Sequence, residues 1–262
     1  MPPRIRIRTV LVMMTCLALN ACAASSPQAG QTASPANRPT PTDTPPAGTF
    51  YFTTEDGVTL NGRIIGNGKT ALVFSNGQDV PKFVWHPVAE QLANSGYLCL
   101  LYDYRGLSPS QGRDDQQSRD RDLRAAIGAV RARGATAVVL VGASFGGTLA
   151  LALAPQIQPK AVIILSAPLS ADVFTVSEAD LKALTAPKLF MASQDDTRFV
   201  GAVQQMYDMS SEPKQLHIFP GKNHGDTILT ASATSGAALS LVATFLHTYA
   251  PATSTPASYM EA

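Results

Sequence analysis

The segment that most constrains the fold is the apolar run Ala137–Val141 and the sequence that follows it, Gly-Ala-Ser-Phe-Gly-Gly at residues 142–147. Such a run is typical of a buried strand, and the small residues after Gly147 favour a helix packed closely against it. A tight turn from strand to helix crowds the backbone, so glycine is needed on both sides of Ser144, at Gly142 and Gly146. In this context G-x-S-x-G predicts a serine presented as a nucleophile.

Strand-like and helix-like segments alternate along residues 49–250, a stretch long enough for one domain with a sizeable core. This alternation favours parallel pairing, whereas the short turns between the first strands favour an antiparallel N-terminal edge. We therefore predict an α/β fold with a doubly wound, mostly parallel sheet of about eight strands and helices on both faces. The predicted strands are 50–54, 59–65, 70–74, 97–102, 137–141, 161–165, 188–192 and 215–219, and the predicted helices are 84–95, 117–134, 144–154, 177–184, 200–209 and 235–249.

The order of these elements resembles the α/β-hydrolase superfamily from Phe50 to about Tyr249, in particular its lidless serine esterases and dienelactone-hydrolase-like members. Residues 102–112 are similar to the loop after the fourth strand of that family, usually written D-x-R-G-x-G-x-S, with Ser108 in place of the second glycine. The resemblance implies a structural part for this loop. Asp103 and Arg105 are expected to stabilise its turns rather than to take part in chemistry.

In this superfamily the catalytic residues follow in the order serine, acid, histidine along the chain. The serine is Ser144, and the resemblance identifies His224, in the glycine-containing loop after the last predicted strand, as the general base. Asp195 and Asp196 both follow the strand that carries the family's acid. Asp196 is favoured because one extra residue lets its carboxylate point back toward the histidine loop, and Asp195 is the alternative.

The resemblance also implies an oxyanion hole of two backbone N–H donors, those of Phe145 and Gln78. The loop before Gln78 has Asn76 where the family often has histidine, a change that leaves the backbone donor in place. Phe83 and Trp85, just downstream, are expected either to line the substrate crevice or to pack a helix.

Only about 22 residues separate Leu165 from Lys188, where lidded relatives insert a helical cap. We therefore expect no cap and an open crevice for small esters. The expected enzyme is a serine hydrolase that acts through an acyl-enzyme, and it is expected to be monomeric. Peptides are the alternative substrates, and a non-catalytic binding lipoprotein of the same fold is the alternative outside enzymes. The sequence indicates no cofactor, and the histidines lack metal-ligand spacing. A net charge of +1 without a basic stripe argues against nucleic acid as a partner.

The first 21 residues are typical of an export signal, because three arginines precede a short apolar stretch. Leu-Asn-Ala-Cys at residues 19–22 resembles the lipobox of bacterial lipoproteins, which implies a lipid on Cys22 and a membrane-anchored, extracytoplasmic protein, with the membrane left open. An ordinary signal peptide is the alternative. Residues 22–48 are rich in Pro, Thr, Ser and Ala, so a disordered tether is expected there, and a flexible tail at 251–262.

Overall fold

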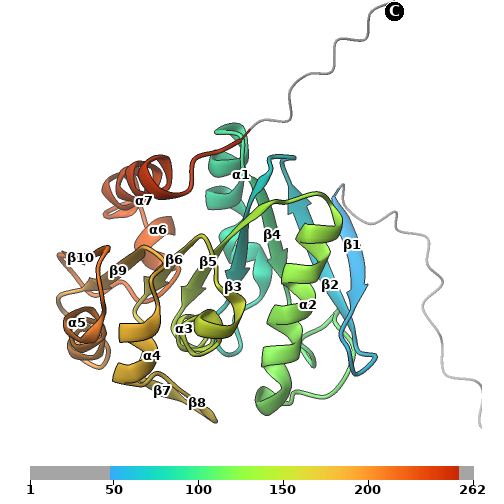
Figure 1. Cartoon of the computed structure of the whole chain (residues 1–262), viewed down its shortest axis with the longest axis horizontal. Coiled ribbons are helices and arrows are strands. Elements are labelled where there is room, and N and C mark those ends of the chain that lie inside the picture. The colour runs from blue at the N-terminus through green and yellow to red at the C-terminus, as the bar shows by residue number, and fades with distance from the viewer. Residues whose placement is uncertain (1–47, 254–262) are drawn as a thin grey trace, which may run out of the picture. The chain divides into compact units, whose positions relative to one another are not determined.

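The computed structural model of the protein describes residues 48–253 (Figure 1). The predicted signal peptide, the lipid on Cys22 and the tether up to residue 47 lie outside the described residues, and so does the tail after Thr253. Within residues 48–253, no helix combines the length and apolarity that crossing a membrane requires.

An eight-stranded sheet runs through the middle of the domain in the order β1-β2-β4-β3-β5-β6-β9-β10. Six strands, from β4 across to β10, are parallel, while β2 pairs antiparallel with both β1 and β4. The predicted fold class is thereby confirmed, including its antiparallel N-terminal edge. The strands are β1 (Thr49–Thr53), β2 (Thr59–Ile65), β3 (Thr70–Ser75), β4 (Leu98–Tyr102), β5 (Ala137–Ala143), β6 (Ala161–Leu165), β9 (Lys188–Ser193) and β10 (Lys214–Phe219).

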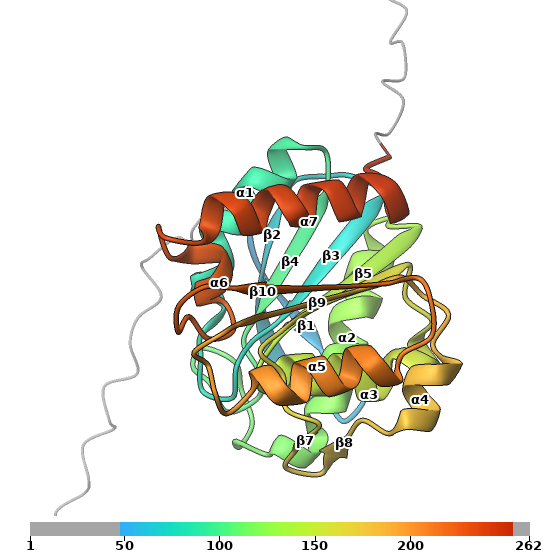
Figure 2. The same ribbon diagram turned by 90° about the vertical axis from the view of Figure 1, so that its left-hand side faces the viewer.

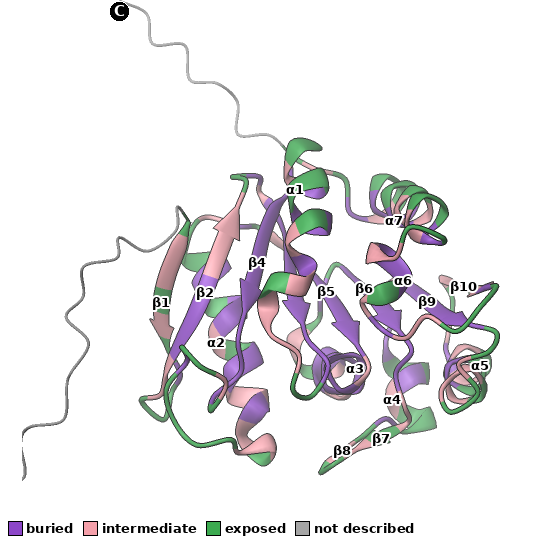
Figure 3. Ribbon diagram, turned by 180° about the vertical axis from the view of Figure 1, so that it is seen from behind, coloured by how far each residue is buried: buried purple, intermediate pink, exposed green. Residues whose placement is uncertain are grey.

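Helices cover both faces of this sheet and enclose a separate apolar core on each side (Figures 1 and 2). On one face lie α2 (Arg119–Ala132), α3 (Phe145–Ile157), α4 (Glu178–Ala183) and α5 (Val200–Met209). On the other lie α1 (His86–Asn94), α6 (Thr227–Thr230) and α7 (Ser235–Tyr249). The central strands carry buried residues along nearly their whole length (Figure 3), which explains why they read as continuous apolar runs.

The structure adds short elements that the sequence pattern did not predict. Two 3-10 turns, η1 (Lys82–Trp85) and η2 (Gln116–Ser118), precede α1 and α2, so both helices begin two residues later than expected. The segment after β6 forms a two-stranded hairpin of β7 (Ser170–Ala171) and β8 (Phe174–Thr175) before α4. Strands of two residues are too short to show a period, so no sequence pattern predicts them.

Candidate active site

Ser144 lies at the sharp turn between β5 and α3, with φ 50° and ψ −120°. A non-glycine residue in this region is strained and persists only where its surroundings hold it. Here the Ser144 N–H donates to the carbonyl of Leu165 on β6 over 2.8 Å. The strained turn raises the serine at the carboxyl ends of the parallel strands, as the G-x-S-x-G pattern predicted.

The two glycines of the motif lie where no side chain fits. A Cβ on Gly142 would lie 2.4 Å from the carbonyl oxygen of Gly146, and a Cβ on Gly146 would lie 2.3 Å from that of Ser75. Both distances are well inside van der Waals contact with backbone atoms. Glycine at these positions therefore allows β5, α3 and the loop after β3 to approach one another.

His224 and Asp196 are joined by a hydrogen bond. His224 Nδ1 lies 2.8 Å from Asp196 Oδ2, and the carboxylate side chain is only 10% exposed. The ring of Phe199 packs against the imidazole with centroids 4.3 Å apart. A carboxylate at Nδ1 fixes the ring orientation and leaves Nε2 as the nitrogen available for proton transfer.

Asp195, the alternative acid, points elsewhere. Its side chain is exposed, and its backbone N–H donates to the carbonyl of Gly221 over 2.9 Å. This bond ties the loop after β9 to the loop after β10. Asp195 thus holds the two loops together through its backbone, while Asp196 supplies the carboxylate that reaches His224.

The histidine loop lies against the serine turn. A Cβ on Gly225, which has φ +57°, would lie 3.3 Å from the Cβ of Ala143 and 4.0 Å from the backbone nitrogen of Ser144. The His224 N–H donates to the hydroxyl of Thr227, which in turn donates to the His224 carbonyl. The structure therefore brings Ser144, Asp196 and His224 together at the carboxyl ends of the strands β5, β9 and β10.

The loop after β3 is fixed on the other side of Ser144 by the side chain of Asn76. This residue is fully buried, its amide nitrogen donates to the carbonyl of Tyr102, and its amide oxygen accepts from the indole of Trp85. The Gly146 N–H also donates to the Asn76 carbonyl over 3.0 Å. Asparagine here braces the loop against β4, η1 and α3 at once.

The N–H groups of Gln78 and Phe145 belong to segments on either side of the nucleophile. Phe145 directly follows Ser144, and a Cβ on Gly77, which precedes Gln78, would lie 3.9 Å from the Cβ of Ser144. Neither N–H has a hydrogen-bond acceptor within residues 48–253. Two backbone donors without partners beside a strained serine are what an oxyanion site requires.

The structure does not support a crevice-lining position for Trp85. Its side chain is fully buried, packs on Phe74 with ring centroids 5.3 Å apart, and donates its N–H to Asn76. The large apolar ring belongs to the core under α1, where its one polar atom finds a partner. Phe83, by contrast, is 69% exposed on η1 and meets solvent.

Arg119, at the start of α2, is a buried residue of the site that was not among the predicted site residues, and it is only 1% exposed. Its Nη1 donates to the Gln78 carbonyl over 2.8 Å, and its Nη2 donates to Asp114 over 2.7 Å. A signal for it exists in the sequence. Arg119 lies four and eight residues before Leu123 and Ile127, on the apolar face of the helix, where a charge needs a partner.

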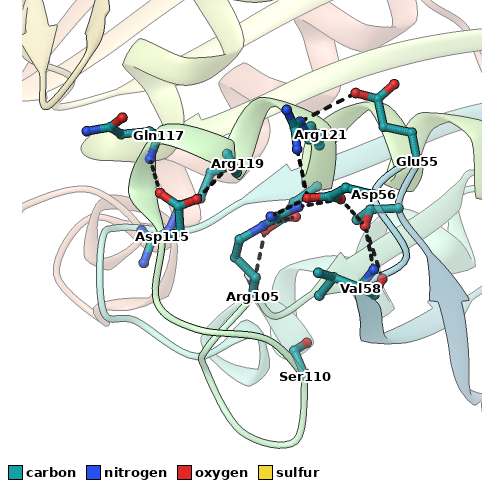
Figure 4. A network of polar contacts seen from close by, with 12 residues as sticks. Glu55, Asp56, Val58, Arg105, Ser110, Asp115, Gln117, Arg119 and Arg121 are labelled. Atoms are coloured by element: carbon teal, nitrogen blue, oxygen red, sulfur yellow. Dashed lines mark hydrogen bonds and ion pairs between the residues drawn. The ribbon is translucent and has the colours of Figure 1, made fainter.

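The loop after β4 is held by ion pairs, as expected for Asp103 and Arg105. The buried Asp103 pairs with Lys82 and accepts from its backbone N–H over 2.7 Å. The Arg105 guanidinium binds Asp122 on α2 and Asp56 in the turn after β1, each over 2.8 Å (Figure 4). Arg105 holds the pKa of Asp56 well below its usual range, so that carboxylate stays charged. This network connects three elements beside the site.

Within the described part of the chain, no cluster of three or more His, Cys, Asp or Glu is arranged to hold a metal ion. Cys99, the one cysteine among these residues, is a buried free thiol in β4.

Comparison with known proteins agrees with this architecture. A model of the alpha/beta hydrolase family matches residues 72–187. An uncharacterized protein of Mycobacterium tuberculosis is 27% identical over 199 residues, which cover 66% of this chain and 70% of that protein. The polyketide transferase GrgF of Penicillium sp. is 34% identical over 134 residues, 47% of this chain and 46% of the relative.

Among solved structures, the esterase Pf2001 of Pyrococcus furiosus superposes with a TM-score of 0.68 at 20% identity, over 77% of this chain and 89% of that one. At this identity the likeness establishes the fold, which is the α/β-hydrolase fold.

Proposed function

We propose that this chain, built on the α/β-hydrolase fold, is a serine hydrolase that cleaves carboxylic esters. The observation that carries the proposal is the convergence of a strained Ser144 with a hydrogen-bonded His224–Asp196 pair at one edge of the sheet. Degenerate proteins of this fold have no need to keep such a constellation. The esterase name of a structural neighbour adds support.

In this proposal the Ser144 hydroxyl attacks the ester carbonyl carbon while His224 Nε2 takes the hydroxyl proton. The carbonyl oxygen becomes an oxyanion that accepts hydrogen bonds from the N–H groups of Gln78 and Phe145. Collapse of the tetrahedral intermediate breaks the bond to the alcohol, which leaves with the proton from His224. Water then attacks the acyl-enzyme by the same steps and releases the acid.

Asp196 orients the imidazole and stabilises its charged form. Its side chain is mostly buried, and this strengthens the interaction with the imidazolium that forms during each proton transfer. The choice of His224 as base follows from general imidazole chemistry, since an imidazole can take and return a proton near neutral pH.

Small esters suit the site because only the β7–β8 hairpin and α4 lie between β6 and β9. No large cap is present within that segment to enclose a long substrate. A specific alternative comes from GrgF, whose name describes a transferase. The same acyl-enzyme yields transfer when an alcohol or amine replaces water in the second step, so analysis of the products separates the two.

The first experiment is labelling with a fluorophosphonate together with turnover of p-nitrophenyl acetate. Ser144→Ala and His224→Ala are the controls, and both should abolish labelling and turnover while the protein stays folded. A folded wild-type protein with neither labelling nor turnover would point to a non-catalytic binding protein of the same fold. Hydrolysis of a peptide substrate at a rate above that of the ester would favour the peptidase alternative.

The location proposed is outside the cytoplasm, on a membrane, through a lipid on Cys22. The support is the sequence of residues 1–22 alone. Metabolic labelling with a palmitate analogue tests it, because Cys22→Ser should lose the label and leave the protein in the soluble fraction. Label retained in Cys22→Ser would contradict the lipid assignment.

A further inference from the structure

We propose that Arg119 is a positioning residue that holds both donors of the oxyanion hole, an inference that rests on the proposed function. The two proposed donors come from different elements, Gln78 from the loop after β3 and Phe145 from the first turn of α3. Arg119 touches both residues. It reaches the first through a hydrogen bond and the second through its aromatic ring.

The contact with Gln78 fixes the conformation of an otherwise exposed loop. Gln78 is solvent-exposed, and its carbonyl accepts from Arg119 Nη1 over 2.8 Å. Within this loop, Val80 N–H to Gly77 carbonyl is a long bond of 3.3 Å. The Gln78 carbonyl and the Gln78 N–H belong to consecutive planar peptide groups that are joined at the Gln78 Cα, so with the carbonyl anchored only rotation about the two backbone bonds of that Cα can reorient the N–H. The bond from Arg119 thus restricts the conformations open to the peptide group that carries the donor.

The contact with Phe145 acts through the ring. The guanidinium carbon lies 5.0 Å from the centroid of Phe145 and 4.6 Å from that of Tyr104. The Phe145 ring is also packed edge-on by Tyr104 at 5.9 Å and by Phe174 of β8 at 6.0 Å. Phe145 follows the strained Ser144 directly, so the position of its ring restricts the backbone that carries the second donor.

The bonding pattern of Arg119 differs from that of an arginine used only for stability. Arg105 is buried to a similar degree, and its guanidinium donates to two carboxylates, those of Asp56 and Asp122. Arg119 donates from Nη2 to the Asp114 carboxylate and from Nη1 to a neutral carbonyl of the active-site loop, that of Gln78. Its Nε has no partner within residues 48–253. A structural arginine gains more from a second carboxylate than from one carbonyl. The arrangement therefore favours a part in placing Gln78.

The test measures turnover and transition-state binding in Arg119→Met and Arg119→Lys. We expect Arg119→Met to lower kcat about 10²-fold, comparable to the loss of one oxyanion donor, while KM for p-nitrophenyl acetate changes less than threefold. Affinity for a boronic acid, which forms a tetrahedral adduct on Ser144, should fall by the same factor as kcat/KM. Arg119→Lys keeps the charge but loses the planar fork, so it should fall between wild type and Arg119→Met.

Arg121→Met is the matched control. Arg121 lies two residues after Arg119 on α2, and its side chain forms ion pairs with Glu55 and Asp56 at the surface. Its kcat and boronic acid affinity should stay at wild-type levels. If Arg119→Met fails to fold, Asp114→Asn replaces it, because it removes one anchor of the guanidinium without emptying the core. A severalfold drop in kcat at unchanged KM is then expected.

Unchanged kcat in folded Arg119 and Asp114 variants would overturn the positioning role. So would a drop in activity that follows the loss of thermal stability alone, with boronic acid affinity unchanged. A wild-type protein without labelling or turnover is a different result, because it overturns the proposed function itself. An active wild type with insensitive Arg119 variants would overturn only the inference about Arg119.

Discussion

At Gly146 the space that a side chain would occupy is filled by backbone on the opposite side of the active site. A methyl group there would lie 2.3 Å from the Ser75 carbonyl oxygen and 2.5 Å from that of Asn76. We expect Gly146→Ala to displace the loop that carries Gln78, lowering stability by about 1–3 kcal/mol and ester turnover by about 10²-fold. Urea denaturation and p-nitrophenyl acetate hydrolysis measure the two effects.

Gly128→Ala provides the matched control for that change. Gly128 lies inside α2, and nothing approaches within 4 Å of the added Cβ. Alanine there should raise stability by about 0.5–1 kcal/mol, because it favours the helix, and leave turnover unchanged. Equal behaviour of the two alanine variants would show that crowding at Gly146 has no consequence.

The two neighbouring aspartates after β9 should differ sharply in their effect on turnover. Asp196 accepts at His224 Nδ1, whereas Asp195 is exposed. We expect Asp196→Asn to lower kcat about 10³–10⁴-fold, since the amide cannot hold the productive tautomer, and Asp195→Asn to change kcat less than fivefold. The opposite order in steady-state kinetics would assign the acid to Asp195.

The sequence could narrow the acid to these two residues but could not choose between them on firm ground. One residue of register decides which carboxylate faces the histidine, and the register depends on how the loop after β9 turns. That turn is set by a contact distant in sequence, the bond from the Asp195 N–H to the Gly221 carbonyl. The part that Arg119 takes in the site could not be predicted for a similar reason, since its partner Gln78 lies 41 residues away in the sequence.

At the scale of elements, α2 is fastened to the sheet by charge as well as by apolar packing. Asp122 on this helix is fully buried, and the Arg105 guanidinium forms ion pairs with both Asp122 and Asp56. Arg105→Met would leave the Asp122 carboxylate buried without its cation, which should lower the free energy of unfolding by about 3–5 kcal/mol. Urea denaturation followed by circular dichroism measures this loss.

Arg121→Met gives the comparison on the same helix. Its side chain is 41% exposed, so the ion pairs that it makes with Glu55 and Asp56 are screened by water. We expect a loss below about 1 kcal/mol. If both variants lost the same stability, burial of Asp122 would not govern the strength of the attachment.

The type of an element could be predicted where its apolar pattern extends over many residues, and it could not be predicted where the element is short. The apolar runs of β5 and β6 and the face Leu123, Ile127 and Val130 of α2 appear where the sequence placed them. The β7–β8 hairpin could not be predicted from the sequence, because strands of two residues are too short to carry a periodic pattern. The sequence left two positions possible for the Trp85 side chain, the substrate crevice or the core. Its hydrogen bond to Asn76 in the structure decides for the core.

At the scale of the whole molecule, the alternation of strands and helices predicts a parallel, doubly wound sheet but not the order of its strands. No local pattern in the sequence predicts the position of β3 between β4 and β5, which the structure shows. This order matters for function, since it puts the loop after β3 next to the serine turn after β5. The two halves of the proposed oxyanion hole meet only through that adjacency.

Cys99 reports on the integrity of this sheet. It lies in β4, fully buried, and burial raises the pKa of its thiol to about 12. At pH 8 only about one thiol in 10⁴ is then ionised, and that form alone reacts. In a variant with Cys16→Ser and Cys22→Ser we expect no reaction of the native protein with a thiol reagent, and one equivalent after unfolding in guanidinium.

The rate of labelling should therefore measure global unfolding. β4 lies between β2 and β3, so Cys99 becomes accessible only when the sheet opens. The free energy from labelling in urea should equal that from circular dichroism. Thr136→Cys, at an exposed position, should react at once in the same background. Rapid labelling of native Cys99 would mean that the antiparallel edge β1–β2 opens by itself, and that the sheet does not unfold as one unit.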